Sequence, residues 1–279
     1  MRDLNGTTIL VTGATDGLGK RVARELAGKG ATVLLHGRYC ERLEAALEDI
    51  RKETGSERLG SYLADLSSLA QVRALAERIL SDQIRLDVLI NNAGVIVRER
   101  KESEDGFELT FAVNYLAHFL LTSLLSPLLR DSAPARIVNV ASAGQSPVDF
   151  DDVMLERRYD GMRAYTQSKL AQIIFTFELA ERLSGSGVSV NALHPASLMD
   201  TKMVSETFGY TMSTVHEGAV ATVHLAASPD VEGVTGRYFD GLHEARANRQ
   251  AYDPAAREKL WALSEDLCGP FLSPVARRR

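Results

Sequence analysis

The chain has 279 residues, of which 45% are hydrophobic and 25% are charged, and its formal net charge at pH 7 is −5. That length allows a substantial buried core, and the composition is typical of a soluble globular protein. The negative net charge and the lack of a basic stripe argue against nucleic acid as a partner.

The N-terminal stretch and the cysteines bear on the compartment. The stretch MRDLNGTTILVTG has only a short apolar run, broken by Thr and Gly, so we expect neither a signal peptide nor a membrane anchor. Cys40 and Cys268 are far apart, and the six histidines lack metal-ligand spacing. We therefore expect a reduced, cytoplasmic protein without a metal site. The run Arg277–Arg279 is expected to be a solvated tail.

Short apolar runs alternate with longer amphipathic stretches along the chain. Strands are predicted at residues 7–12, 31–37, 59–65, 86–92, 135–142 and 188–195. Helices are predicted at 17–29, near 40–53, over SLAQVRALAERIL, over FELTFAVNYLAHFLLTSLLSPLLR, over YTQSKLAQIIFTFELAERL and near 254–267. Strands that are apolar on both faces and alternate with helices indicate βαβ units. The pattern predicts a single α/β domain with a Rossmann-type, doubly wound parallel sheet of about seven strands, with helices on both faces.

The first predicted strand is followed by TGATDGLG, which places Gly13, Gly17 and Gly19 at the start of a helix. Glycine lets the backbone turn sharply and approach a pyrophosphate, while the helix N-terminus offers N–H groups and a positive dipole end. The spacing G-x3-G-x-G differs from the G-x-G-x-x-G dinucleotide fingerprint. A purely structural glycine turn is the alternative, and we favour phosphate binding.

Arg38 follows Gly37 at the end of the second predicted strand. An acidic residue in this place would bind the ribose 2′-hydroxyl of NAD, whereas arginine accommodates the 2′-phosphate of NADP. The alternative is a surface ion pair between Arg38 and Glu41 or Glu44. We favour the NADP interpretation.

Polar residues also follow the later strands. Asp65 could accept a hydrogen bond from an adenine amino group, and Ser67 is suited to cap the next helix. The stretch NNAG (91–94) brings small residues and two amides to the same edge. Ser142 ends the fifth strand in VNVASAG, which lacks the Gly-x-Ser-x-Gly elbow of serine hydrolases. Asn114 lies within an apolar helix, where its amide must cap a neighbouring backbone group or hold a water.

The stretch AYTQSKL places Tyr165 four positions before Lys169, so the two side chains share one face of a helix. Taken alone, such a pair is most often an ordinary surface or core-edge feature. Its meaning depends on the other motifs.

These motifs together resemble the short-chain dehydrogenase/reductase (SDR) family, in matching order from about residue 5 to residue 240. Within it, the chain is similar to the NADP-dependent retinol-dehydrogenase-like branch and its soluble bacterial relatives. The likeness rests on T-G-x3-G-x-G, Asp65-Leu66, N-N-A-G, Asn114, Ser142 and Y-x3-K. It implies one domain over 1–279, with a cofactor-binding and catalytic core (1–195), a substrate lid (196–215), and a last helix, last strand and C-terminal extension (216–279).

The resemblance implies a carbonyl reductase or alcohol dehydrogenase with four catalytic residues. Tyr165 would be the general acid in reduction and the base in oxidation. Ser142 would hold the substrate oxygen, and Lys169 would favour the phenolate and contact the nicotinamide ribose. Asn114 would position a water that links Lys169 to solvent.

The implied cofactor is NADP(H), with NAD(H) as the alternative. The residues implied to bind it are Gly13, Thr15, Asp16, Gly17, Leu18, Gly19, Arg38, Asp65, Leu66, Asn92, Ala93, Gly94, Tyr165, Lys169, Pro195 and Thr201. The chain departs from the family in having Pro195-Ala196 where Pro-Gly is usual, and in having Thr201 one residue later than expected.

The implied substrate is a small, apolar carbonyl or alcohol, bound between segment 143–163 and segment 197–215. The second segment supplies the apolar side chains Met199, Met203, Phe208, Tyr210 and Met212. Family members commonly pair the helices after the fourth and fifth strands, so a homodimer or homotetramer is expected. Two other hypotheses are a non-catalytic NADPH-binding sensor or scaffold and, ranked lower, a sugar-nucleotide epimerase-like enzyme.

Overall fold

In the computed structural model, which describes residues 3–273 and 275, eight strands form one sheet in the order β3-β2-β1-β4-β5-β6-β7-β8. Neighbouring strands are parallel except for β7 and β8. The strands are β1 (Thr8–Val11), β2 (Thr32–Gly37), β3 (Leu59–Leu63), β4 (Val88–Asn91), β5 (Ala135–Val140), β6 (Val188–His194), β7 (Arg237–Asp240) and β8 (His243–Ala245). The predicted doubly wound sheet is confirmed, and the short antiparallel β8 adds one strand to the seven expected.

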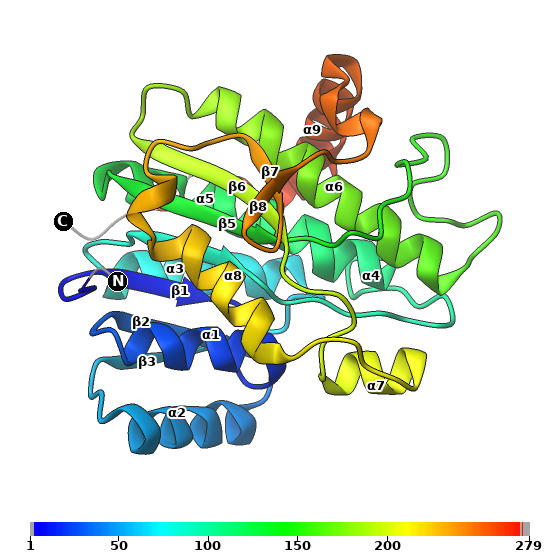
Figure 1. Ribbon diagram of the computed structural model, residues 1–279. Helices are drawn as coiled ribbons and strands as arrows, with labels where there is room; N and C mark the ends of the chain where they lie inside the picture. Colours follow the sequence, from blue (N-terminus) through cyan, green and yellow to red (C-terminus); the bar gives the residue numbers. More distant parts are fainter. Residues whose placement is uncertain (1–2, 274, 276–279) are drawn as a thin grey trace.

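Helices cover both faces of this sheet (Figure 1). One face carries α1 (Gly17–Ala27), α2 (Cys40–Thr54) and α8 (Val215–Ala227). The other face carries α3 (Leu69–Asp82), α5 (Ala117–Asp131) and α6 (Gly161–Arg182). The shorter elements and the last helix are α4 (Leu109–Phe111), the π-helical turn η1 (Ala112–Leu116), α7 (Lys202–Phe208), α9 (Pro254–Cys268) and the 3-10 turns η2 (Pro229–Val231), η3 (Arg249–Tyr252) and η4 (Gly269–Phe271).

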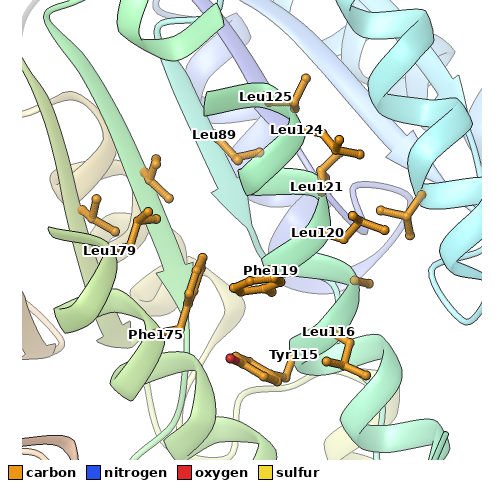
Figure 2. Close-up of a cluster of buried hydrophobic side chains, with 14 of the residues drawn as sticks. Leu89, Tyr115, Leu116, Phe119, Leu120, Leu121, Leu124, Leu125, Phe175 and Leu179 are labelled. Atoms are coloured by element: carbon orange, nitrogen blue, oxygen red, sulfur yellow. The ribbon is translucent and has the colours of Figure 1, made fainter. Parts of the chain in front are cut away.

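The helical run Leu109–Asp131 is both long and apolar. By length and composition it could cross a membrane, but 83% of its apolar stretch is buried inside this structure. The rings of Tyr115 and Phe119 face that of Phe175 on α6 (Figure 2), and the centroids of Phe119 and Phe175 are 5.5 Å apart. Packing within the domain core therefore explains the apolar sequence. The cytoplasmic location stays a prediction.

The C-terminal helix α9 packs over α5 and α6. Trp261 places its ring 5.2 Å from Phe119 and 6.0 Å from Phe175, measured between centroids. The hydroxyl of Ser264 lies 2.6 Å from that of Tyr115. The apolar surface of the two helices is thus covered in part by the chain itself, and homo-oligomerisation through them stays a prediction.

The start of α3 differs from expectation. Ser67 does not cap this helix, because its backbone N–H and its hydroxyl both donate to Asp65 Oδ1, at 2.9 and 2.8 Å. The helix begins two residues later, and Leu69 N donates to Asp105 Oδ2 at 2.8 Å. A carboxylate distant in sequence supplies the cap, so the predicted cap was wrong.

Strand β5 ends at Val140, two residues before Ser142, which lies in the loop that follows. The predicted tail Arg277–Arg279 lies outside the described residues. The division at residues 195 and 215 stays a prediction.

Candidate active site

A cavity of about 720 Å³ opens at the carboxyl ends of the parallel strands, between the sheet and the segment that carries α7. Figure 1 shows α7 at this end of the sheet. All of the predicted catalytic and cofactor-binding residues line the cavity except Asn114. Parallel strands bring their carboxyl ends to one edge, which is why residues scattered from position 13 to position 201 meet there.

The glycine turn forms one wall of the cavity. Gly13 and Gly17 have φ values of +65° and +49°, which favour glycine. A Cβ on Gly19 would lie 2.2 Å from Gly13 O and 2.5 Å from Asn92 Nδ2. Asp16 caps α1 by accepting from Gly17 N at 2.7 Å. The bare backbone at the N-terminus of this helix is a suitable cradle for a pyrophosphate.

Neighbouring strands hold the turn in place. Asn92 Nδ2 donates to Thr12 O at 2.8 Å, and Thr12 Oγ1 accepts from Asn92 N and Ala93 N at 2.9 and 3.0 Å. Gly13 N donates to His36 Nδ1 at 3.3 Å. Burial lowers the pKa of His36 to about 4, so the ring is neutral and can accept this bond. The NNAG stretch therefore has a structural role beside any contact with a ligand.

Three side chains after β2 form a cationic and aromatic end of the cavity. The Arg38 guanidinium lies 4.6 Å from the centre of the Tyr39 ring, and that of Arg42 lies 5.4 Å from the same centre. Arg38 pairs with Asp65 at 3.7 Å, and not with Glu41 or Glu44 as the alternative proposed. The sequence analysis did not identify Tyr39 and Arg42. The signal for Arg42 is its position in the first turn of the helix that follows Arg38.

Helix α6 carries Tyr165 and Lys169 to the opposite end. Its first turn is capped by Asp160, whose Oδ1 accepts from Arg163 N at 2.8 Å. Burial raises the pKa of Tyr165, and a hydrogen bond with Ser142 acts in the opposite direction. The Ser142 hydroxyl also accepts from Gly144 N at 3.1 Å.

Lys169 is almost completely buried. Its Nζ donates to Val140 O at 2.8 Å and to Gln172 Oε1 at 2.9 Å. Burial lowers the pKa of Lys169 to about 7. An amine that titrates near neutral pH beside a buried phenol is typical of a functional site.

Asn114 lies behind the cavity wall, in the turn η1. Its Oδ1 accepts from Val95 N at 2.7 Å, and its Nδ2 donates to Val95 O and to Ser168 Oγ, both at 3.0 Å. The capping alternative is the one observed for this side chain. The proposed water beside Asn114 stays a prediction.

The segment after β6 closes the cavity. Met199, Met203 and Phe208 line it as expected. Tyr210 and Met212 lie outside it and are 59% and 70% exposed, because they follow α7 on the way back to α8. For these two residues the predicted place in the pocket was wrong.

Thr201 and segment 143–163 both contribute to the lining of the cavity and also make contacts that stabilise the local fold. Thr201 caps α7 by accepting from Val204 N at 3.3 Å while it lines the cavity. From 143–163, Ala143, Gly144 and Met162 line the cavity, whereas Asp149 pairs with Arg163 at 2.8 Å.

Comparison with known proteins places this arrangement in context. The family model described as short chain dehydrogenase matches residues 7–209. The chain is 41% identical to retinol dehydrogenase 13 of Mus musculus, over 95% of this chain and 84% of the relative. It is 40% identical to retinol dehydrogenase 14 of Homo sapiens, over 95% and 87%. A short chain dehydrogenase structure from Escherichia coli CFT073, complexed with NADPH, has a TM-score of 0.72 and 28% identity, over 86% of this chain and 98% of that one.

Proposed function

The chain belongs to the short-chain dehydrogenase family, with retinol-dehydrogenase-like relatives, and on that premise we propose that it transfers a hydride between NADP(H) and a carbonyl or alcohol substrate. The observation that carries the proposal is the convergence of Ser142, Tyr165 and Lys169 on a cavity whose other wall is the glycine turn. The proposed catalytic group is the Tyr165 phenol.

When bound, the nicotinamide cofactor supplies or accepts the hydride. In carbonyl reduction, Tyr165 donates its proton to the substrate oxygen, and in alcohol oxidation it takes the proton back. Because burial raises the pKa of Tyr165, the phenol keeps its proton at neutral pH, which suits a donor. The Ser142 hydroxyl binds the same substrate oxygen, and a charged Lys169 favours the phenolate.

NADP(H) is the proposed cofactor because the far end of the cavity is cationic. Arg38 and Arg42 flank Tyr39, and an arginine fork suits a 2′-phosphate. The similar structure that contains NADPH supports this choice. The glycine turn, Asp65 and Asn92 would hold the rest of the dinucleotide.

The proposed substrate is apolar. Met162, Met199, Met203 and Phe208 supply apolar side chains to the lining of the cavity that also contains Tyr165. Methionine adapts its shape readily, which suits a flexible or elongated apolar molecule. The relatives named retinol dehydrogenases support a substrate of this class.

The test is oxidation of NADPH or NADH by the purified chain with a panel of aldehydes, ketones and quinones. Tyr165→Phe is expected to lower turnover about 10²- to 10⁴-fold, the usual contribution of a general acid, while NADPH binding persists. Tyr252→Phe is the control, because this phenol accepts from Ala247 N and lies outside the cavity.

Each contrary result has a distinct meaning. Faster turnover with NADH would keep the enzyme and overturn the role given to Arg38. Tight NADPH binding without turnover across the panel would favour the non-catalytic sensor. Consumption of a UDP-sugar without net cofactor oxidation would favour the epimerase-like hypothesis.

A further inference from the structure

Behind Lys169 lies a buried polar chain that the proposed mechanism does not use. Gln172 and His118 are each 1% exposed. Gln172 Oε1 accepts from Lys169 Nζ at 2.9 Å, and Gln172 Nε2 lies 3.1 Å from His118 Nδ1. The same ring nitrogen lies 3.0 Å from the backbone oxygen of Asn114, and His118 Nε2 lies 3.4 Å from Thr12 Oγ1. Lys169 is thus joined to the η1 turn by two side chains.

We propose that Gln172 and His118 are positioning residues that hold Lys169 in place and couple its protonation state to the η1 turn. The inference rests on the proposed function, since it takes Lys169 as part of the active site. It is based on counting hydrogen-bond donors and acceptors from Lys169 through Gln172 to His118. This count gives one arrangement of hydrogen bonds for charged Lys169 and another for neutral Lys169.

When Lys169 is an ammonium, its Nζ can only donate, so Gln172 presents Oε1 to it and Nε2 to His118. His118 Nδ1 must then accept from Gln172 Nε2 and carry no proton, so it meets Asn114 O at 3.0 Å without a hydrogen bond. The ring proton lies on Nε2, 3.4 Å from Thr12 Oγ1, which already accepts from Asn92 N and Ala93 N. When Lys169 is neutral, its Nζ can accept from Gln172 Nε2, and the amide turns over. His118 Nδ1–H can then donate to Gln172 Oε1 and to Asn114 O.

The titratable groups around Lys169 and His118 are consistent with a change of His118 tautomer when Lys169 loses its proton. Among the described residues, Tyr165 on α6 and His118 on α5 are the titratable groups beside Lys169, and His36 on β2 also acts on His118. Burial and the charge of Lys169 lower the pKa of His118 to about 3, so the ring stays neutral while Lys169 titrates. A change at His118 near pH 7 would therefore report a change of tautomer and not of charge.

The experiment is an NMR titration of the full chain with selectively labelled lysine and histidine. Lys169→Arg and His118→Gln assign the two signals. In the wild-type protein, the chemical shifts of the two His118 ring nitrogens are expected to report a change of tautomer. This change should have the same midpoint pH as the titration of Lys169. Unchanged His118 shifts across that midpoint would overturn the inference, and this measurement needs no variant of Gln172 to fold.

Three variants measure the role of Gln172. Gln172→Leu removes an acceptor from the ammonium and should lower the Lys169 midpoint by about one pH unit. Gln172→Glu adds a negative charge and should raise it. Gln167→Leu is the matched control: Gln167 is also buried on α6, but it binds Asp149 N and Val153 O.

Equal midpoints in Gln172→Leu and Gln167→Leu would overturn the inference while leaving the proposed function intact. The reverse result is also distinguishable. If the midpoints shift as expected but no Tyr165-dependent turnover exists, the proposed function fails and the coupling stands.

Discussion

Tyr165 and Lys169 lie one turn apart on α6, and Lys169 Nζ is 5.7 Å from the centre of the Tyr165 ring. Burial acts on both groups in the direction of the neutral form, because it raises the pKa of the phenol and lowers that of the amine. At pH 7 the buried amine therefore lowers the stability of the folded protein, whereas the phenol is uncharged in both the folded and the unfolded chain and does not. That effect can be measured separately from catalysis.

Lys169→Met is expected to raise the free energy of unfolding at pH 7. The pKa of Lys169 is about 7 in the folded chain, against 10.5 as its ordinary value, so the unfolded chain binds more protons between these limits. Wild-type stability should then rise with pH in this window by about 1.4 kcal/mol per pH unit from this residue alone. Urea unfolding at pH 7, 8 and 9 measures the slope.

The Lys169→Met advantage should shrink as pH rises, since the penalty disappears once both states are deprotonated. Lys52→Met is the control, because this side chain on α2 is 70% exposed. A difference between wild type and Lys169→Met that stays constant from pH 7 to pH 9 would contradict the prediction.

Arg38→Ala is expected to weaken NADPH binding and leave NADH binding nearly unchanged. A hydrogen-bonded ion pair with a phosphate is worth enough to change the dissociation constant by about 10- to 100-fold. Fluorescence titration with the two cofactors measures the effect. Arg51→Ala is the control, because Arg51 lies on α2, the helix that follows Arg38, and pairs with Glu48. Equal losses for NADPH and NADH would remove the argument for a 2′-phosphate site.

Gly19→Ala is expected to abolish cofactor binding. The new methyl group would lie 2.2 Å from Gly13 O, so the turn must shift. Such overpacking should also lower the free energy of unfolding by about 1–3 kcal/mol. Gly28→Ala, at the end of the same helix, is the control. Its φ is −64°, and the nearest atom to its Cβ would be Arg24 O at 3.4 Å. Wild-type NADPH affinity in Gly19→Ala would argue against the cradle.

The residues at the strand ends could be predicted from the sequence because a parallel sheet gathers them regardless of loop detail. Partners set by distant segments could not. The cap of α3 comes from Asp105, and Gln172 on α6 meets His118, which lies 54 residues earlier in the chain. Nothing near these residues in sequence signals such contacts. The predicted positions of Tyr210 and Met212 were wrong for a related reason, since composition does not say which side chains of a segment face a cavity.

The packing position of α9 also could not be predicted from the sequence, although the helix itself could. Its docking depends on Trp261, whose ring meets Phe119 and Phe175 across two other helices. The Arg182 guanidinium lies 4.0 Å from the centre of the Trp261 ring. The Trp261 side chain thus joins three helices. Substitutions at this residue can therefore test how much the C-terminal extension contributes to the free energy of unfolding.

Trp261→Ala is expected to lower the free energy of unfolding by about 3 kcal/mol, because it leaves a gap between α9, α5 and α6. Trp261→Phe should recover most of that loss, since a smaller ring still meets Phe119 and Phe175. Urea unfolding followed by far-UV circular dichroism measures both variants, as the change removes the single tryptophan that fluorescence would follow. If Trp261→Ala unfolds at the wild-type urea concentration, α9 is an appendage and α5 and α6 are stable without it.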